Sequence, residues 1–414
     1  MRRGLAFSWP ASFFFLRRPA ACFRLESLIV STLPKTDFLL DPDVVFLNHG
    51  SFGACPRPVF AEYQRWQAEL ERQPVEFLGR RYSDLLRSAR EALAAYVGAA
   101  PDELVYVPNA TTALNIVARS LRLEPGDEIL TTDHEYGAMD RTWRFLCAKW
   151  GARYLTQPIP VPVTTAEAFV DAFWEGVTPA TRVIFISHLT SPTALVFPLR
   201  AICRRARAAG LLTIVDGAHT VGQIPLDLAD LGADIYTSNC HKWLCAPKGS
   251  AFLYVRRDLQ RLIEPLIVSW GWQSEAPGPS RFIDEHEYTG TRDIAAYLAT
   301  PAAIAFTQQP QWETVRAECH ALAVEAQTRV GALTGLAPLS GPDWFAQMVS
   351  LPLPACDVGA LKARLYDEFR VEVPVLRWDE HTLVRVSCQA YNTRADLDQL
   401  VAGLHTLLPQ VRRP

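Results

Sequence analysis

Between residues 103 and 255, short apolar runs rich in β-branched residues alternate with amphipathic stretches that repeat at the spacing of a helix. The runs predict strands over 103–107, 128–131, 152–157, 182–188, 211–215, 235–237 and 251–255. Helices are predicted between them, over 108–121, 142–150, 166–177 and 199–209. This alternation indicates an α/β fold in which a large, mostly parallel sheet is covered by helices on both faces.

The chain on either side of this region predicts further elements and a second, smaller domain. A strand over 43–47 leads into a glycine-punctuated turn over 48–53 and then into long helices over 58–97. We predict a large domain over 43–310 and a small C-terminal α+β domain over 311–414. After the large domain's irregular stretch at 269–288 and helical stretch at 295–306, the predicted elements are a long helix over 313–333, strands over 346–351, 371–375 and 382–386, and helices over 358–368 and 393–408.

Residues 1–42 differ from the rest of the chain and are predicted to be a poorly ordered extension. Arginines flank an apolar patch over 5–16, an arrangement that also fits a targeting segment. Pro10 divides this patch, however, and no clear cleavage site follows it. We therefore leave the extension out of the fold prediction.

Composition excludes several classes of function. The 41 basic and 44 acidic residues give a net charge of −3, which offers no broad electrostatic footprint for nucleic acid. No apolar run reaches the length of a membrane span. The nine cysteines are scattered, odd in number and free of CxxC pairs, so we expect neither a disulfide framework nor a metal site. The same pattern predicts a reducing, cytoplasmic location.

The stretch over 211–244 places an acid and an amine at one edge of the predicted sheet. Asp216 ends one strand run, and Lys242 follows the next. In open α/β sheets this edge is where ligands bind. A lysine there can form a Schiff base with pyridoxal phosphate, and an acid can keep the pyridine nitrogen protonated so that the ring accepts electrons. Either residue alone is explained as well by an ordinary charge at the end of a strand.

Polar groups that suit a phosphate lie at the same edge. Thr111 and Thr112 follow a predicted strand and open a helix, whose backbone N–H groups and dipole favour an anion. Simple capping by Asn109 or Thr111 is the alternative for this site. Asn239 and His241 lie just before Lys242 and offer further hydrogen bonds to a phosphate. A histidine at the end of a strand with its hydrogen bonds satisfied by the protein is the alternative for His241.

Four more residues could complete a cofactor and substrate site. Tyr136 could stack on a cofactor ring, or it could belong to the core. His219 could reach the phenolic oxygen, and Ser191 faces the same edge unless it only forms a turn before a proline. Arg385 alternates with apolar neighbours on a predicted strand; its planar guanidinium suits a substrate carboxylate, but a surface ion pair is the alternative.

Taken together, these residues resemble a known family. The set at 111–112, 216–219, 241–242, 290–291 and 385–392 is similar in order and spacing to class V aminotransferases of the fold-type I pyridoxal phosphate superfamily. The resemblance covers about residues 43–408. Within it, the motifs at 47–53, 133–138, 239–243 and 289–293 most resemble isopenicillin N epimerase-like proteins.

The resemblance implies a cofactor role for most of these positions. Lys242 and Asp216 would be the catalytic pair, with Lys242 in the Schiff base and Asp216 at the ring nitrogen. Tyr136 would stack on the ring, where cysteine desulfurases carry a histidine. The phenolic oxygen and the phosphate of pyridoxal 5'-phosphate would be held by His219, Ser191, Thr111, Thr112, Asn239 and His241.

The same resemblance implies an assembly and a substrate. The enzyme would be a homodimer with active sites at the subunit interface, in which Gly290 and Thr291 reach the phosphate from the second subunit. The substrate would be an amino acid, with its carboxylate on Arg385. His49 and Tyr136 are expected near the substrate, where either could donate a second proton; a purely structural role is the alternative for His49.

The expected reaction begins when Lys242 releases the cofactor to the substrate amine and takes the α-proton as a base. An isopenicillin N epimerase-like epimerase or racemase is the preferred function. A C–S lyase or an aminotransferase on the same scaffold is the alternative, and a non-catalytic cofactor-binding protein is a third hypothesis. Desulfurase chemistry through a persulfide is disfavoured, because residues 371–381 contain no cysteine and Cys388 is expected to be a buried structural thiol.

Overall fold

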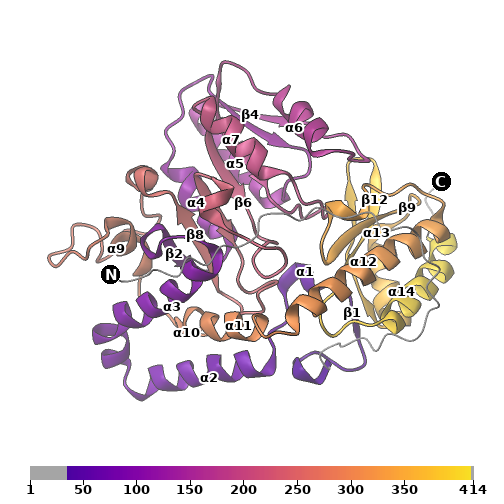
Figure 1. Cartoon of the computed structure of the whole chain (residues 1–414), viewed down its shortest axis with the longest axis horizontal. Coiled ribbons are helices and arrows are strands. Elements are labelled where there is room, and N and C mark those ends of the chain that lie inside the picture. Colours follow the sequence, from indigo (N-terminus) through magenta and orange to yellow (C-terminus); the bar gives the residue numbers. More distant parts are fainter. Residues whose placement is uncertain (1–34, 412–414) are drawn as a thin grey trace, which may run out of the picture. The chain divides into compact units, whose positions relative to one another are not determined.

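A seven-stranded sheet forms the centre of the structure, a computed structural model that describes residues 35–411 (Figure 1). Its strand order is β2-β8-β7-β6-β5-β3-β4, and all neighbours are parallel except β8, which is antiparallel to both β2 and β7. This arrangement confirms the predicted mostly parallel sheet. The strands are β2 (Leu104–Val107), β3 (Glu128–Thr132), β4 (Arg153–Gln157), β5 (Thr181–Ser187), β6 (Leu212–Asp216), β7 (Ile235–Ser238) and β8 (Ala251–Val255).

Both faces of this sheet are buried, because successive side chains of each strand enter two different apolar clusters. In β2, Leu104 and Tyr106 join one cluster, whereas Val105 and Val107 join the other. Helices α4 and α5 contribute to the second cluster, and α3, α6 and α7 contribute to the first. The helices that follow the strands are α4 (Ala110–Ser120), α5 (Gly137–Trp150), α6 (Ala166–Trp174), α7 (Leu199–Ala208) and the short α8 (Leu228–Leu231).

The predicted helical region over 58–97 consists of α2 (Arg57–Arg72) and α3 (Tyr82–Val97), joined by the short segment η2 (Glu76–Arg80). Two later expectations need correction. The stretch over 269–288 is not wholly irregular, because it contains α9 (Arg281–Glu287). The helical stretch over 295–306 is divided, because a new helix starts around a proline in its first turn. These two helices are α10 (Ala295–Leu298) and α11 (Thr300–Thr307).

The C-terminal part contains a three-stranded antiparallel sheet in the order β11-β12-β9. The predicted single strand over 371–375 is wrong, because Pro374 lacks an N–H and interrupts the ladder. Residues before it pair with β1 near the start of the chain, and residues after it pair with β12. The elements are β1 (Val45–Phe46), α12 (Trp312–Thr334), β9 (Met348–Leu353), α13 (Val358–Phe369), β10 (Val371–Glu372), β11 (Val375–Trp378), β12 (His381–Ser387) and α14 (Arg394–Leu407).

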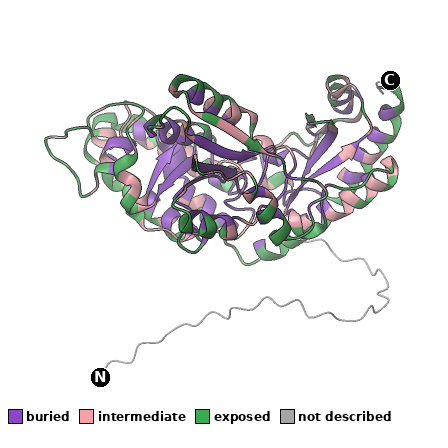
Figure 2. Ribbon diagram, turned by 90° about the horizontal axis from the view of Figure 1, so that it is seen from above, coloured by how far each residue is buried: buried purple, intermediate pink, exposed green. Residues whose placement is uncertain are grey.

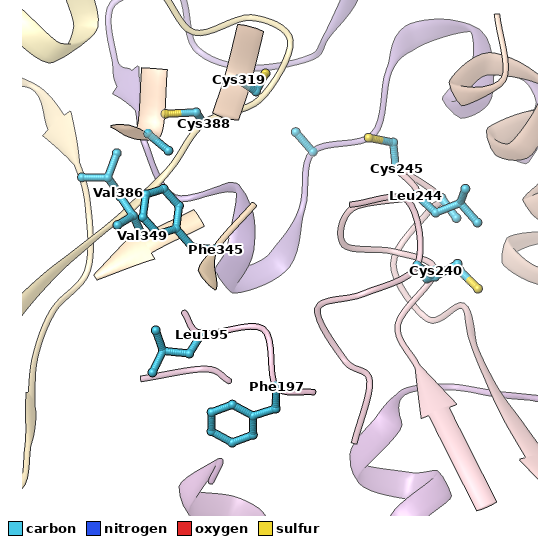
Figure 3. Close-up of a cluster of buried hydrophobic side chains, with 14 of the residues drawn as sticks. Leu195, Phe197, Cys240, Leu244, Cys245, Cys319, Phe345, Val349, Val386 and Cys388 are labelled. Carbon is cyan, nitrogen blue, oxygen red and sulfur yellow. The ribbon is translucent and has the colours of Figure 1, made fainter. Parts of the chain in front are cut away.

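One apolar core connects the seven-stranded sheet with the three-stranded sheet. Figure 3 shows part of it, with Val349, Val386 and Cys388 around the small sheet and Leu244 and Cys245 on the loop after β7. Buried residues gather along the strands of both sheets, while the outward faces of the helices are exposed (Figure 2). By their contacts, the described residues 35–411 belong to a single compact unit.

The predicted domain boundary at residue 310 stays a prediction. The predicted extension over 1–42 lies largely outside the described residues, which begin at Lys35. Within residues 35–411, no helix combines the length and the apolar character that a membrane span requires.

The predicted turn over 48–53 contains a one-turn helix, α1 (His49–Phe52), which packs against the loop that carries Lys242. Gly53 follows it with a φ of 70°, in the left-handed region that favours glycine. A Cβ atom at this position would lie 2.1 Å from the backbone oxygen of His241. The glycine therefore allows α1 to approach the lysine loop closely.

Candidate active site

A cavity of about 190 Å³ lies where β5, β6 and β7 end. Ser187 is the last residue of β5, Asp216 is the last residue of β6, and the two are register partners in neighbouring strands. Asn239 follows β7 directly, and all three residues line the cavity. The cavity therefore lies at the carboxyl edge of the sheet, where a ligand is expected in an open α/β fold.

Most of the predicted site residues meet at this cavity. Of the predicted residues outside its lining, Arg385, His49 and Thr112 are hydrogen-bonded to residues that line it. Thr112, Gly290 and Thr291 lie outside it in this chain. The predicted residues that line it are Thr111, Tyr136, Ser191, Asp216, His219, Asn239, His241 and Lys242.

Lys242 has the environment of a base. It lies in the turn after β7, and its Nζ atom is 3.2 Å from Nε2 of His219. Burial and the neighbouring cation of Arg385 lower the pKa of Lys242 to about 7, although Asp216 acts in the opposite direction. A large fraction of the molecules therefore has a free amine at this position at neutral pH, as nucleophilic and basic lysines require.

Asp216 is buried and points its carboxyl at the same cavity. Its Oδ1 atom accepts a hydrogen bond of 2.9 Å from the backbone N–H of Ala218. Burial raises its pKa, while this N–H and the charge of Lys242 lower it. A buried carboxyl at the end of a strand gains most from a cationic N–H partner, and a protonated pyridine nitrogen is such a partner.

The N-terminus of α4, the predicted phosphate site, borders the cavity. Asn109 caps this helix, because its Oδ1 atom accepts hydrogen bonds from the backbone N–H and the hydroxyl of Thr112. The amide of Ala110 donates to Oδ1 of Asn239, which ties the helix start to the loop after β7. Thr112 is therefore engaged by the cap residue Asn109, as the capping alternative predicts. Thr111 lines the cavity at the positive end of the helix dipole.

The ring of His241 has a defined proton position. Its Nδ1 atom lies 2.9 Å from the backbone oxygen of Ser250, which can only accept, so Nδ1 carries the proton. Burial and the charge of Lys242 lower the pKa of His241 to about 4. The Nε2 atom therefore donates to a phosphate only when a second proton binds together with the anion.

The guanidinium of Arg385, predicted to bind the substrate carboxylate, is buried. Nη1 donates to the backbone oxygen and the hydroxyl of Ser191, at 2.6 and 3.0 Å, and Nη2 donates to the hydroxyl of Ser51 at 3.1 Å. Within the described part of the chain, its Nε atom has no hydrogen-bond partner. Burial lowers its pKa to about 10, which leaves it cationic at neutral pH. An exposed fraction of 5% rules out the alternative of a surface ion pair.

His49 and the pair Gly290–Thr291 lie away from the cavity in this chain. The Nε2–H group of His49 donates to the backbone oxygen of Lys242 at 3.0 Å, and its Nδ1 atom accepts from the hydroxyl of Tyr391 at 3.0 Å. This geometry favours a supporting role for His49 over the predicted contact with substrate. The approach of Gly290 and Thr291 to the phosphate of a second subunit stays a prediction.

Several lining residues were not predicted from the sequence. Ser51 and Phe52 lie in the glycine-rich motif over 47–53, but the sequence did not indicate which side chains of that motif face the site. Ser187 ends a predicted strand, and the strand-end rule that identified Asp216 could have found it. Leu189 and Ala218 carry no chemical signal.

These residues fit pyridoxal phosphate. The cavity offers a buried amine, a buried carboxyl and a helix N-terminus, and the guanidinium of Arg385 is hydrogen-bonded to two residues of its lining. The amine suits the aldehyde, the carboxyl suits the ring nitrogen, and the helix end suits the phosphate. The guanidinium remains for the carboxylate of a substrate.

Comparison with known proteins identifies the family of this chain. The family model described as aminotransferase class-V matches residues 57–400. The chain is 38% identical over 383 residues to the isopenicillin N epimerase of Amycolatopsis lactamdurans, covering 89% of this chain and 96% of that protein. It is 28% identical over 397 residues to the L-cysteine desulfhydrase of Arabidopsis thaliana, covering 86% of each.

Among solved structures, a lysine-to-alanine variant of the enzyme C-DES, with glycine linked covalently to its pyridoxal phosphate cofactor, has a TM-score of 0.79 and 24% identity. The match covers 90% of this chain and 99% of that one. The fold and the site define a fold-type I, pyridoxal phosphate-dependent enzyme. The chain belongs to the class V aminotransferase family, and the resemblance to isopenicillin N epimerases is confirmed.

Proposed function

We propose that this enzyme is an isopenicillin N epimerase-like epimerase or racemase that inverts the α-carbon of an amino acid. The observation that carries the proposal is the meeting at one small cavity of Lys242, a base with a pKa of about 7, with the buried cation of Arg385, which is hydrogen-bonded to Ser51 and Ser191 of the cavity lining. The 38% identity to an isopenicillin N epimerase over nearly its whole length supports the same reaction.

The residues of the chain divide the work between cofactor and substrate. Pyridoxal phosphate, when bound, provides an electron sink for the electron pair that remains at the α-carbon after the proton has left. Asp216 keeps the ring nitrogen protonated, and Lys242 first holds the cofactor and then moves the α-proton. Arg385, which donates to Ser51 and Ser191, holds the carboxylate, and this contact fixes the α-carbon relative to Lys242.

Inversion requires a proton donor on the face opposite the base. Tyr136 lines the cavity and is 47% exposed, so its hydroxyl can exchange protons with water. His49 lies outside the lining and is occupied by the backbone of Lys242. We therefore assign the second proton to Tyr136, which would also cover the cofactor ring.

The space next to the cavity favours a substrate with a large side chain. Phe52 lines both the 190 Å³ cavity and a neighbouring one of about 390 Å³. Asn48 and Glu372 belong to the second cavity, and Nδ2 of Asn48 donates to Oε1 of Glu372 at 2.9 Å. An amino acid held by Arg385 thus has room for a long side chain with polar groups beyond Phe52.

A C–S lyase is the second candidate, because L-cysteine desulfhydrases are among the relatives of this chain. Such a reaction needs the same base and the same electron sink, and it differs in the bond that breaks next. Within residues 35–411 no cysteine lines the cavity, and Cys388 is fully buried. A reaction through a persulfide on the enzyme is therefore not part of this alternative.

The test is incubation of the purified, cofactor-loaded enzyme with single amino acids in deuterated water. Exchange of the α-proton together with inversion, followed by chiral chromatography, is the result expected for an epimerase. Release of pyruvate and sulfide from cysteine, without inversion of any amino acid, would instead establish the lyase. Stoichiometric formation of a keto acid would establish an aminotransferase.

We also propose that the enzyme is a homodimer located in the cytoplasm. Trp270, Val268 and Phe52 expose 83%, 66% and 72% of their surface in the single chain, which is unusual for large apolar side chains and fits burial by a second copy. A dimer would also bring Gly290 and Thr291 to a second site. Light scattering of the loaded enzyme tests the dimer; a monomer at micromolar concentration contradicts it.

The eight cysteines of the described part are free thiols, which supports the proposed location in a reducing compartment.

A further inference from the structure

Trp243 follows Lys242 directly in the chain and is fully buried. It packs with Leu189, Ala194 and Met348 in a small apolar cluster, and its ring centroid lies 5.0 Å from that of His49. These contacts fix the place of the indole ring. Its N–H group therefore has a fixed direction.

This N–H donates to Nδ1 of His219 over 3.3 Å. Because an indole nitrogen can only donate, Nδ1 of His219 must present a lone pair. His219 is buried, and its pKa lies well below the usual value because of burial and the charges of Lys242 and Arg385. The neutral ring therefore carries its single proton on Nε2.

The Nε2 atom lies 3.2 Å from Nζ of Lys242. With a proton on Nε2, His219 donates in this contact and Lys242 accepts, which requires the free amine. An ammonium group at Lys242 has three donors and no lone pair, so it would place a donor against a donor. The tautomer of His219 thus opposes protonation of Lys242.

We propose that Trp243 is a positioning residue, whose indole N–H fixes the Nε2–H tautomer of His219 and thereby holds Lys242 as a free amine. The backbone supports this arrangement. At Gly222, which has a φ of 88°, a Cβ atom would lie 2.5 Å from the backbone of Trp243 and Leu244, so the loop of His219 lies directly on the loop of Lys242. The side chain of Gln223 donates to the backbone oxygen of His219 at 2.7 Å and anchors it further.

The other groups around Lys242 act on it independently of this contact. Arg385, from β12, opposes the ammonium form, and Asp216, at the end of β6, favours it. His241, on the same loop as Lys242, has a lowered pKa and is neutral at pH 7. The contribution of Trp243 therefore adds to those of burial and Arg385. With cofactor bound, the same Nε2–H group would be available to the phenolic oxygen, a consequence that rests on the proposed function.

The test measures the pH at which Lys242 gains its proton in the full-length, cofactor-free chain. Trace acetic anhydride is applied across a pH series, and acetylation of the Lys242 peptide is quantified by mass spectrometry. We expect Trp243→Phe to raise the midpoint by roughly half a unit to one unit, because one hydrogen bond is lost. Trp143→Phe is the matched control, since Trp143 is also buried and its N–H has no partner within residues 35–411.

Two variants of His219 separate proton placement from simple packing. In His219→Gln, the amide oxygen can accept from Trp243 while the amide N–H donates to Lys242, so the midpoint should stay near that of the unmodified protein. His219→Leu should raise it, and Trp243→Phe should add nothing in that background. The comparison of His219→Gln with His219→Leu tests the proposal even if Trp243→Phe does not fold.

The proposal would be overturned if the midpoint of Lys242 were the same in Trp243→Phe and in the unmodified chain. It would also be overturned if Trp143→Phe shifted the midpoint as much as Trp243→Phe, or if His219→Gln shifted it as much as His219→Leu. The labelling uses neither cofactor nor substrate. Its failure would therefore leave the proposed reaction untouched, and failure of the reaction would leave the labelling result standing.

Discussion

The residues expected to hold the cofactor follow strand ends within one stretch of the chain, whereas those expected to hold the substrate carboxylate come from distant segments. Asp216 ends β6, and Lys242 lies in the turn after β7, the neighbouring strand of the same sheet. Arg385 belongs to the small sheet and reaches Ser191, 194 residues away, and Ser51, 334 residues away. The first group is placed by backbone ladders and the second by contacts between side chains.

This difference predicts different consequences for substitution. Groups at strand ends keep their positions when one of them is removed, because the sheet holds the others. Their loss should therefore appear in the chemical step. The residues expected to hold the substrate carboxylate are positioned by a chain of hydrogen bonds. A substitution among them should therefore appear first in substrate affinity.

Lys242→Ala should have the largest effect. It removes the base and the amine that holds the cofactor, and a positioned base alone is worth roughly 10²- to 10⁴-fold in rate. We expect α-proton exchange to fall by at least this factor. The protein should also lose the cofactor adduct that borohydride fixes to Lys242, as seen by mass spectrometry of the reduced, digested enzyme. A reducible adduct that survives on another residue would show that Lys242 is not the anchor.

Asp216→Asn should have the next largest effect. The amide cannot keep the pyridine nitrogen protonated, and removal of one preorganised electrostatic group typically costs roughly 10²- to 10³-fold in kcat. The borohydride-fixed link to Lys242 should remain, since the amine is intact. A variant with full exchange activity would remove Asp216 from the electron sink, whereas loss of the link would indicate damage to the fold of the site.

Arg385→Lys and Arg385→Met form a matched pair for the substrate group. Both lose the planar fork, and a charged hydrogen bond is worth about 1.5–3 kcal/mol, so KM should rise roughly 10- to 100-fold in each. Only Arg385→Met removes the cation that lowers the pKa of Lys242. Its pH–rate profile should therefore rise at higher pH than that of Arg385→Lys. Identical profiles in the two variants would show that Arg385 does not act on Lys242 through its charge.

The same contrast explains how much could be predicted from the sequence. Alternating strands and helices identified the sheet, and its carboxyl edge identified Asp216 and Lys242, because local periodicity determines which residues end a strand. Ser51 could not be identified, because its role depends on Gly53 allowing α1 to approach the loop of Lys242. Thr112 and His49 were predicted to contact ligands, yet their hydrogen bonds are used within the protein, which is a property of tertiary contacts. The division of the strand over 371–375 at Pro374 had a visible signal, since proline interrupts a ladder.

Ser51→Ala should have the smallest effect and is the sharpest test of the contrast. The hydroxyl of Ser51 accepts from Arg385 and donates to Oδ1 of Asn48 at 2.5 Å, and Asn48 continues the chain to Glu372. Arg385 keeps its two contacts with Ser191, so the effect on substrate binding is indirect. We expect it to be worth no more than an ordinary hydrogen bond, about 0.5–1.5 kcal/mol, so KM should rise roughly 2- to 12-fold with kcat nearly unchanged. Ser83→Ala, on exposed surface remote from this chain of contacts, is the control. If Ser51→Ala instead lowered kcat with KM unchanged, the residues that hold the substrate carboxylate would be coupled to the proton transfer itself. Substrate binding and the chemical step would then not depend on two separate sets of residues.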